Sequence, residues 1–383
     1  MEIYIHIPFC ARKCEYCSFV SFTGKDDRID AYLLALLEEA SLRKNEITEK
    51  ITTLYIGGGT PSLLKPEQLR FLFQELRKTI PFGDLQEITM EANPGTLTES
   101  LLREMSDAGV NRVSMGMQSS DDSELKRLGR IHLFRDVVRS VELLNAYGLH
   151  NFNLDLIFGL PGQTRISWMK TLHDAIMLNP KHISAYGLIP EEGTPLDARL
   201  KTGEWALPDP EVERDMYEDA LRILRQTGFI QYEISNFARE GFRCLHNIGY
   251  WTQIPYMGLG VSAASMAVTD THEAGMHCRR RTNFTSLDKY IQYVSDGRIP
   301  AEPDDVISPA EARFETIMLS LRMNQGISER GFFRMHGRTV EECYPEQLAK
   351  MEKAGLLLHR NGAWVLSRRG MDIQNSILLE FMD

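Results

Sequence analysis

Long apolar runs are absent from this 383-residue sequence, and basic residues are outnumbered by acidic ones. No stretch approaches the roughly 20 apolar residues that a transmembrane helix needs, so direct membrane insertion is not expected. The first residues lack the basic region and the small-residue cleavage site of a secretory signal, which favours a cytoplasmic protein. Lys and Arg number 43 against 53 Asp and Glu, and the resulting formal net charge of −10 argues against nucleic acid as a partner.

Cysteine is also scarce, with six in the whole chain. Half of them lie close together, as Cys10, Cys14 and Cys17, whereas the others are scattered singly. In a chain without a secretory signal, this uneven distribution indicates a metal or redox site and speaks against a disulfide framework.

The first half of the chain repeats a short apolar strand, a loop and an amphipathic helix. We expect strands at 3–8, 53–56, 87–91, 112–116, 153–158 and 182–188. We expect helices between them at 30–44, 66–78, 99–108, 133–147 and 166–178. This alternation predicts an α/β fold with a parallel sheet and right-handed crossovers. Six such units suit an open, partial version of the eight-stranded TIM barrel, in which ligands bind at the C-terminal ends of the strands.

Three segments follow from the changes in pattern along the chain. We assign 1–207 to the partial barrel, 208–300 to an extension of it and 301–383 to a C-terminal domain. The extension is expected to contain a helix at 211–226 and a strand at 231–237. Helices at 311–323 and 345–354, followed by a hairpin at 356–366, resemble a winged helix. Because the chain is acidic, we interpret this domain as a lid or partner surface and not as a DNA-binding module.

The clustered cysteines have the spacing CxxxCxxC. Three thiolates on one short loop can hold three irons of a cubane cluster and leave the fourth iron open to a small molecule. The alternatives are a zinc knuckle, which usually uses two separated ligand pairs, and three unrelated buried cysteines. The spacing and the position after the first predicted strand favour the cluster.

This motif, with the aromatic Tyr16 before the third cysteine, resembles that of the radical SAM superfamily. The resemblance implies a [4Fe-4S] cluster on Cys10, Cys14 and Cys17 that binds S-adenosylmethionine and can generate a 5′-deoxyadenosyl radical. It also implies a set of residues that hold S-adenosylmethionine: Tyr4, Gly58, Gly59, Thr60, Glu91, Gln118, Arg130 and Asp155. Taken singly, each carboxylate is better explained as a solvated charge or a salt bridge, but the positions of Glu91, Gln118 and Asp155 at strand ends favour the ligand role.

The segments 4–10, 57–61, 114–118 and 155–161 resemble those of two groups within the superfamily. One is the oxygen-independent coproporphyrinogen III dehydrogenase, which makes protoporphyrinogen IX, and the other is the HemW group of heme chaperones. Phe19 stands where the dehydrogenase has a fourth cysteine, and the first strand begins too early for the dehydrogenase's N-terminal extension. The sequence therefore favours a heme chaperone. The dehydrogenase, a porphyrin biosynthesis enzyme, remains the alternative, so whether the chain is an enzyme stays open.

The segment 246–251 matches the HNxxYW motif of the HemW group. The resemblance implies that heme is handled here, with His246 as a candidate axial ligand and Tyr250 and Trp251 stacking on the porphyrin. The alternative is a His-Asn pair that caps a turn, with the aromatic rings packed in the core. The resemblance further implies heme-acceptor proteins, respiratory ones among them, and a reductant such as a flavodoxin or ferredoxin.

Overall fold

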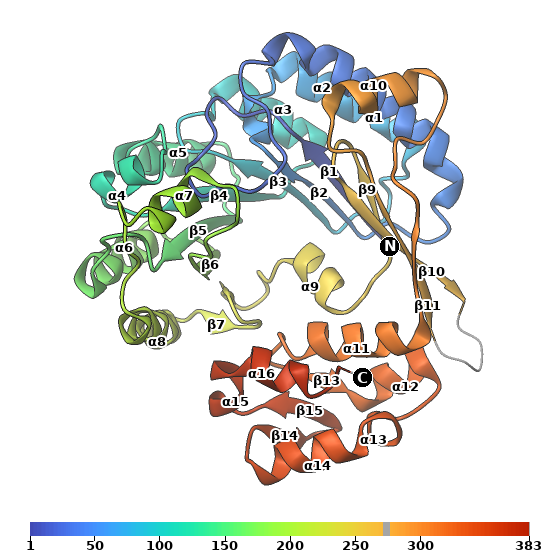
Figure 1. Ribbon diagram of the computed structural model, residues 1–383. Coiled ribbons are helices and arrows are strands. Elements are labelled where there is room, and N and C mark those ends of the chain that lie inside the picture. The colour runs from blue at the N-terminus through green and yellow to red at the C-terminus, as the bar shows by residue number, and fades with distance from the viewer. Residues whose placement is uncertain (271–275, 383) are drawn as a thin grey trace.

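A computed structural model describes residues 1–270 and 276–382 (Figure 1). Its main feature is one mixed sheet with the strand order β12-β11-β10-β9-β1-β2-β3-β4-β5-β6-β8-β7. The six predicted parallel strands are present and lie next to one another in sequence order: β1 (Glu2–Ile7), β2 (Thr53–Gly58), β3 (Glu87–Ala92), β4 (Arg112–Gln118), β5 (Phe152–Phe158) and β6 (His182–Gly187). Within the described residues β12 and β7 are the two edge strands and do not pair with each other, so the sheet is open, as expected of a partial barrel.

The sheet extends beyond these six strands at both ends. Next to β1 lies a seventh parallel strand, β9 (Tyr256–Leu259), followed by the antiparallel strands β10 (Ala264–Asp270), β11 (His277–Thr282) and β12 (Asp305–Ile307). Next to β6 lie β8 (Asn236–Ala238) and β7 (Ile230–Gln231). The single strand predicted at 231–237 is therefore wrong. A turn closed by a hydrogen bond from the Asn236 amide to the Glu233 carbonyl splits it into two short strands.

Helices follow the strands and cover one face of the sheet (Figure 1). The predicted ones are α1 (Ile29–Arg43), α2 (Pro66–Thr79), α3 (Glu99–Ala108), α5 (Phe134–Ala146), α6 (Arg165–Met177) and α8 (Pro210–Gln226). Shorter helices not predicted from the sequence are α4 (Asp122–Arg127), α7 (Pro195–Lys201), α9 (Leu245–Trp251), α10 (Leu287–Ser295), η1 (Asp26–Arg28), η2 (Lys44–Glu46) and η3 (Pro61–Leu63). Helix α3 begins at Thr98, whose hydroxyl accepts from the Leu101 amide, and ends at Gly109 with φ +88°.

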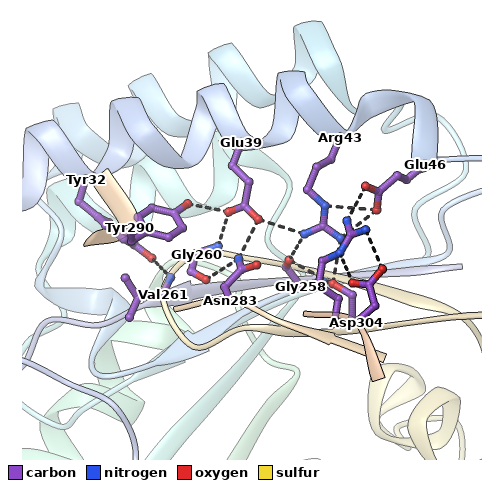
Figure 2. Close-up of polar contacts among 12 residues, drawn as sticks. Tyr32, Glu39, Arg43, Glu46, Gly258, Gly260, Val261, Asn283, Tyr290 and Asp304 are labelled. Carbon is purple, nitrogen blue, oxygen red and sulfur yellow. Dashed lines mark hydrogen bonds and ion pairs between the residues drawn. The ribbon is translucent and has the colours of Figure 1, made fainter. Parts of the chain in front are cut away.

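Helix α1 is tied to the extension by a buried polar network (Figure 2). Arg43 donates to Glu39 at 3.0 Å and to the carbonyl of Gly258 at 2.8 Å. Glu39 accepts from the Tyr290 hydroxyl at 2.6 Å and from the Asn283 amide at 2.7 Å. Because Glu39 and Arg43 are almost fully buried, removing either partner would leave an uncompensated charge in the core. The network therefore fixes strands β9 to β11 against the barrel.

The C-terminal domain has its own hydrophobic core around Phe332 and Leu357. It contains a three-stranded antiparallel sheet of β13 (Ile327–Ser328), β15 (Ala363–Leu366) and β14 (Leu357–Arg360). Its helices are α11 (Pro309–Ser320), α12 (Glu329–His336), α13 (Val340–Cys343), α14 (Pro345–Lys353), α15 (Arg368–Asp372) and α16 (Gln374–Leu379). The predicted hairpin is confirmed. Figure 1 shows α11 facing the sheet, with α9 lying between them. Among the described residues, no helix is long and apolar enough to cross a membrane.

Candidate functional site

The cysteine loop begins directly after β1 and is fastened to that strand. His6 contacts the Val20 carbonyl through Nε2 at 2.8 Å and the Tyr4 hydroxyl through Nδ1 at 2.9 Å. Main-chain hydrogen bonds from Phe22 to Pro8 at 2.6 Å and from Cys10 to Phe22 at 3.0 Å close the loop on itself. Tyr4 and His6 thus position the start and the end of the segment that contains the three cysteines.

All three cysteines are free thiols and partly exposed. In the part of the chain that the structure describes, the one set of three or more ligand atoms lying within 4.8 Å of one another is Glu329, Glu341 and His359. The three sulfurs are therefore not gathered as closely as a tetrahedral zinc ion requires, with its Zn–S bonds of about 2.3 Å. A cluster, whose thiolates bind different irons, suits this wider spacing.

A chain of polar contacts links two of the cysteines across the strand ends. The Cys10 sulfur lies 3.5 Å from the Thr60 hydroxyl, which accepts from Asn93 at 2.9 Å. Arg130 donates to Asn93 at 2.5 Å and to the Cys14 sulfur at 3.4 Å. Four of these residues line a pocket of about 320 Å³, part of it open to solvent: Cys14, Thr60, Asn93 and Arg130. The pocket offers a guanidinium fork and hydroxyl and amide groups to a ligand on the cluster.

The glycine turn at the end of β2 has a steric cause. A Cβ atom on Gly58, whose φ is +111°, would lie 2.5 Å from the His6 ring, and one on Gly59 would lie 2.7 Å from the Phe9 carbonyl. The Gly58 amide donates to Glu91 at 3.0 Å. The glycines thus allow the turn to pass the cysteine loop closely, and this amide is engaged by a protein carboxylate.

The two predicted carboxylates are not solvated charges. Glu91 accepts from the Tyr55 hydroxyl at 2.8 Å, and burial together with the nearby Asp155 raises its pKa to about 7. Asp155 accepts from Asn153 at 2.8 Å and from Ser114 at 3.1 Å, and burial raises its pKa despite these hydrogen bonds. Two acidic groups held in a polar interior suit a ligand that brings a positive charge and hydroxyl donors.

Gln118 and Arg130 converge over the same strand end. Gln118 has a φ of +64° and is 8% exposed, and its Nε2 would lie 2.8 Å from a Cβ atom on Gly116. Arg130 donates to the Gly116 carbonyl at 2.9 Å. The absence of a side chain at Gly116 therefore makes room for both residues. Thr60, Gln118 and Arg130 form one group beside the cysteines.

Two residues of this site, Asn93 and Tyr55, were not predicted from the sequence, and Tyr16 was named only for its place in the cysteine motif. Asn93 connects Thr60 to Arg130, and Tyr55 holds Glu91. Tyr16 is partly buried near Arg130, and desolvation raises its pKa. Asn93 directly follows the strand that carries Glu91, and Tyr16 precedes the third cysteine, so both had a positional signal. Tyr55 had none.

The motif at 246–251 forms helix α9, and His246 is completely buried in it. Its Nδ1 lies 2.7 Å from the Thr53 hydroxyl and its Nε2 lies 3.0 Å from the Tyr250 hydroxyl. Burial lowers the pKa of His246 to about 3 and raises that of the neighbouring Glu2 to about 8. The histidine is therefore neutral, and both ring nitrogens are occupied by protein partners, as in the capping and packing alternative.

The two aromatic residues of the motif point to different places. Tyr250 packs edge-on against Tyr256, with ring centroids 4.7 Å apart. Trp251 packs instead near Tyr232, and Arg322 lies 4.9 Å from its ring centroid. The motif thus contributes Tyr250 and Trp251 to separate clusters and not to one shared stacking surface.

The cysteine loop lies at the C-terminal ends of parallel strands and is surrounded by polar side chains. This is the arrangement of the radical SAM class. Residues 4–175 match the family described as "Radical SAM superfamily". Residues 307–373 match the "HemN C-terminal domain". These matches cover the barrel and the C-terminal domain respectively.

Relatives that match this chain over almost their whole length identify its family within the superfamily. The chain is 34% identical to the heme chaperone HemW of Bacillus subtilis, with 99% of this chain and 98% of the relative covered. It is also 34% identical to the heme chaperone HemW of Escherichia coli, over 100% and 98%. The chain therefore belongs to the HemW family of radical SAM proteins, and this membership supplies the [4Fe-4S] cluster and S-adenosylmethionine as its cofactors.

A solved structure shares the fold. Coproporphyrinogen III oxidase (HemN) from Escherichia coli superposes with a TM-score of 0.83, at 22% identity, over 99% of this chain and 89% of that chain. The likeness supports the open α/β architecture with an added C-terminal domain. At this identity it concerns the fold alone.

Proposed function

We propose that this protein is a radical SAM heme chaperone that binds heme and delivers it to acceptor proteins. The observation that carries the proposal is full-length similarity to several chains named heme chaperone, with identities of 33% to 34%. Phe19, whose side chain is 66% exposed, stands at the position where the dehydrogenase has a fourth cysteine. This position therefore provides no thiol. We therefore favour heme delivery over coproporphyrinogen oxidation as the function of this protein.

In this proposal the thiolates of Cys10, Cys14 and Cys17 hold the cluster. When bound, the cluster and S-adenosylmethionine supply one-electron reductive chemistry. Arg130 offers its fork to the carboxylate of S-adenosylmethionine, and Glu91 accepts hydrogen bonds from the ligand. Asp155 is placed to accept from ribose hydroxyls.

The remaining predicted ligands have supporting roles. Gln118 and Thr60 add polar contacts, the turn at Gly58 and Gly59 brings the main chain close to the ligand, and Tyr4 forms a wall of the site. We propose that 1–207 holds these cofactors, that 208–300 completes the sheet and carries the heme-related motif, and that 301–383 covers the open face. We further propose a cytoplasmic location, respiratory heme acceptors and a flavodoxin or ferredoxin as reductant.

The test uses the full chain with an anaerobically reconstituted cluster. Hemin is titrated while the Soret band is recorded, and the loaded protein is mixed with the apo form of a b-type cytochrome. The proposal expects saturable hemin binding and transfer faster than from free hemin. In parallel, the reduced protein is incubated with S-adenosylmethionine and coproporphyrinogen III. Sustained formation of protoporphyrinogen IX, or no hemin binding at all, overturns the proposal.

A further inference from the structure

A second cleft lies between the sheet extension and the C-terminal domain. One wall is the face of β9, β10 and β11 that carries Tyr256, Met266 and Arg280. Met266 pairs with Tyr256 on one side and with Arg280 on the other, so the three side chains form a row across neighbouring strands. The opposite wall is helix α11 with Met318. The cleft encloses about 850 Å³, part of it open to solvent.

The cleft is lined by apolar side chains, by one cation and by side chains of types that can bond iron. The lining includes the aromatic rings of Tyr250 and Tyr256 and the thioethers of Met266 and Met318, and these groups suit a large, flat, apolar ligand. Arg280 adds one cation, whose side chain is 36% exposed. Tyr256 and Cys278 are side chains of types that can bond iron through a phenolate or a thiolate.

We propose that this cleft is the heme-binding site, with the porphyrin between β9–β11 and α11 and a propionate at Arg280. The inference rests on the proposed function, because it names the place where a heme chaperone holds its cargo. His246 then acts from behind the wall of the cleft, because its Nε2 contacts the hydroxyl of Tyr250, which lines the cleft. His246 is a positioning residue, and iron is bonded from the cleft wall.

The cleft adjoins the candidate S-adenosylmethionine site through Tyr4. This residue lines the cleft, and its hydroxyl contacts His6, which holds the cysteine loop. Its ring also packs beside Tyr55, the partner of Glu91, with centroids 6.2 Å apart. Heme in the cleft would therefore share a wall with the S-adenosylmethionine site.

The cleft is bridged by one ion pair. Arg280 donates to both carboxylate oxygens of Glu315 on α11, each at 3.0 Å. A heme propionate would have to compete with Glu315 for the guanidinium and would be repelled by its charge. Replacing Glu315 by glutamine therefore frees Arg280 and removes a like charge, so hemin binding should become tighter.

The experiment is a hemin titration of the full-length protein and five variants, followed by the Soret band and by tyrosine and tryptophan fluorescence quenching. Ala264→Phe fills the cleft, whereas Ala267→Phe, on the same strand but on its other face, is the matched control. Arg280→Gln is paired in the same way with Arg279→Gln. Glu315→Gln is the variant expected to gain affinity. Circular dichroism and thermal unfolding confirm that each variant is folded.

We expect Ala264→Phe to weaken hemin binding about tenfold or more and Arg280→Gln to weaken it several-fold. Both controls should stay within about twofold of the wild type, and Glu315→Gln should bind more tightly. If the wild type binds hemin, Ala264→Phe and Arg280→Gln match their controls and Glu315→Gln matches the wild type, the cleft assignment is wrong while heme binding stands. If the wild type does not bind hemin, the proposed function fails. If Ala264→Phe is unfolded, Arg280→Gln and Glu315→Gln decide the matter.

Discussion

Arg130 donates a hydrogen bond to the sulfur of Cys14 at 3.4 Å, although the two residues are 116 positions apart in the chain. The same guanidinium is held by Asn93 and by the Gly116 carbonyl, so its orientation is fixed by two other strand ends. A charged donor aimed at a cluster thiolate stabilises the more negative, reduced state of a cluster. The contact therefore joins ligand binding and redox tuning in one side chain.

Replacing Arg130 with methionine should make the reduction potential of the reconstituted cluster more negative by about 40 mV, which corresponds to about 1 kcal/mol for one electron. The same change should weaken binding of S-adenosylmethionine. An anaerobic potentiometric titration followed by electron paramagnetic resonance measures the shift. Arg139→Met, which alters an exposed arginine, serves as the control. Equal potentials in both variants would show that the contact with Cys14 does not influence the cluster.

Glu91 should make the binding of S-adenosylmethionine dependent on pH. Its pKa is raised to about 7, so the free protein holds the protonated acid below that pH and the carboxylate above it. A cationic ligand favours the carboxylate, and its affinity should therefore fall as pH drops through about 7. Glu91→Gln should bind about tenfold more weakly above this pH and lose the dependence. Equilibrium dialysis at several pH values, with Glu99→Gln as an exposed control, measures both effects.

His246 should matter for stability more than for heme ligation. Its pKa is about 3 in the folded chain and about 6.5 in an unfolded one, so protons bind preferentially to the unfolded state between these values. The free energy of unfolding contributed by this residue should fall by about 1.4 kcal/mol per pH unit as pH drops below 6.5.

The variant His246→Gln tests this view by denaturant unfolding across that pH range. It should be less stable than the wild type near neutral pH, by about 1–3 kcal/mol, because the contacts with Thr53 and Tyr250 are disturbed. Its stability should decline less steeply in acid. The position of the hemin Soret band should not change. A changed band with an intact fold would contradict this view.

The sequence predicts the parallel strands and the cysteine loop because both depend on local patterns. Apolar runs alternate with amphipathic helices, and three thiols lie on one loop, so no distant contact has to be known. Strand β9 is different: it is short, and it is recognisable only through its pairing with β1, more than two hundred residues away in the chain. From the sequence, His246 is likewise a candidate ligand. Its contact with Thr53, 193 residues away in the chain, is visible only in the structure.

The separation of the two sites leads to a last prediction. Replacing Cys10, Cys14 and Cys17 together with alanine should remove the cluster, because in the described residues no other thiol lines the pocket beside that loop. None of the three cysteines lines the proposed heme cleft, so its affinity for hemin should stay within about threefold of the wild-type value. Iron and sulfide analysis after reconstitution, followed by a hemin titration on the same samples, measures both properties. Cys343→Ala, in the C-terminal domain, controls for the general loss of a thiol. Full iron and sulfide in the triple variant would disprove the cluster assignment, whereas joint loss of cluster and hemin binding would show that the two sites depend on each other.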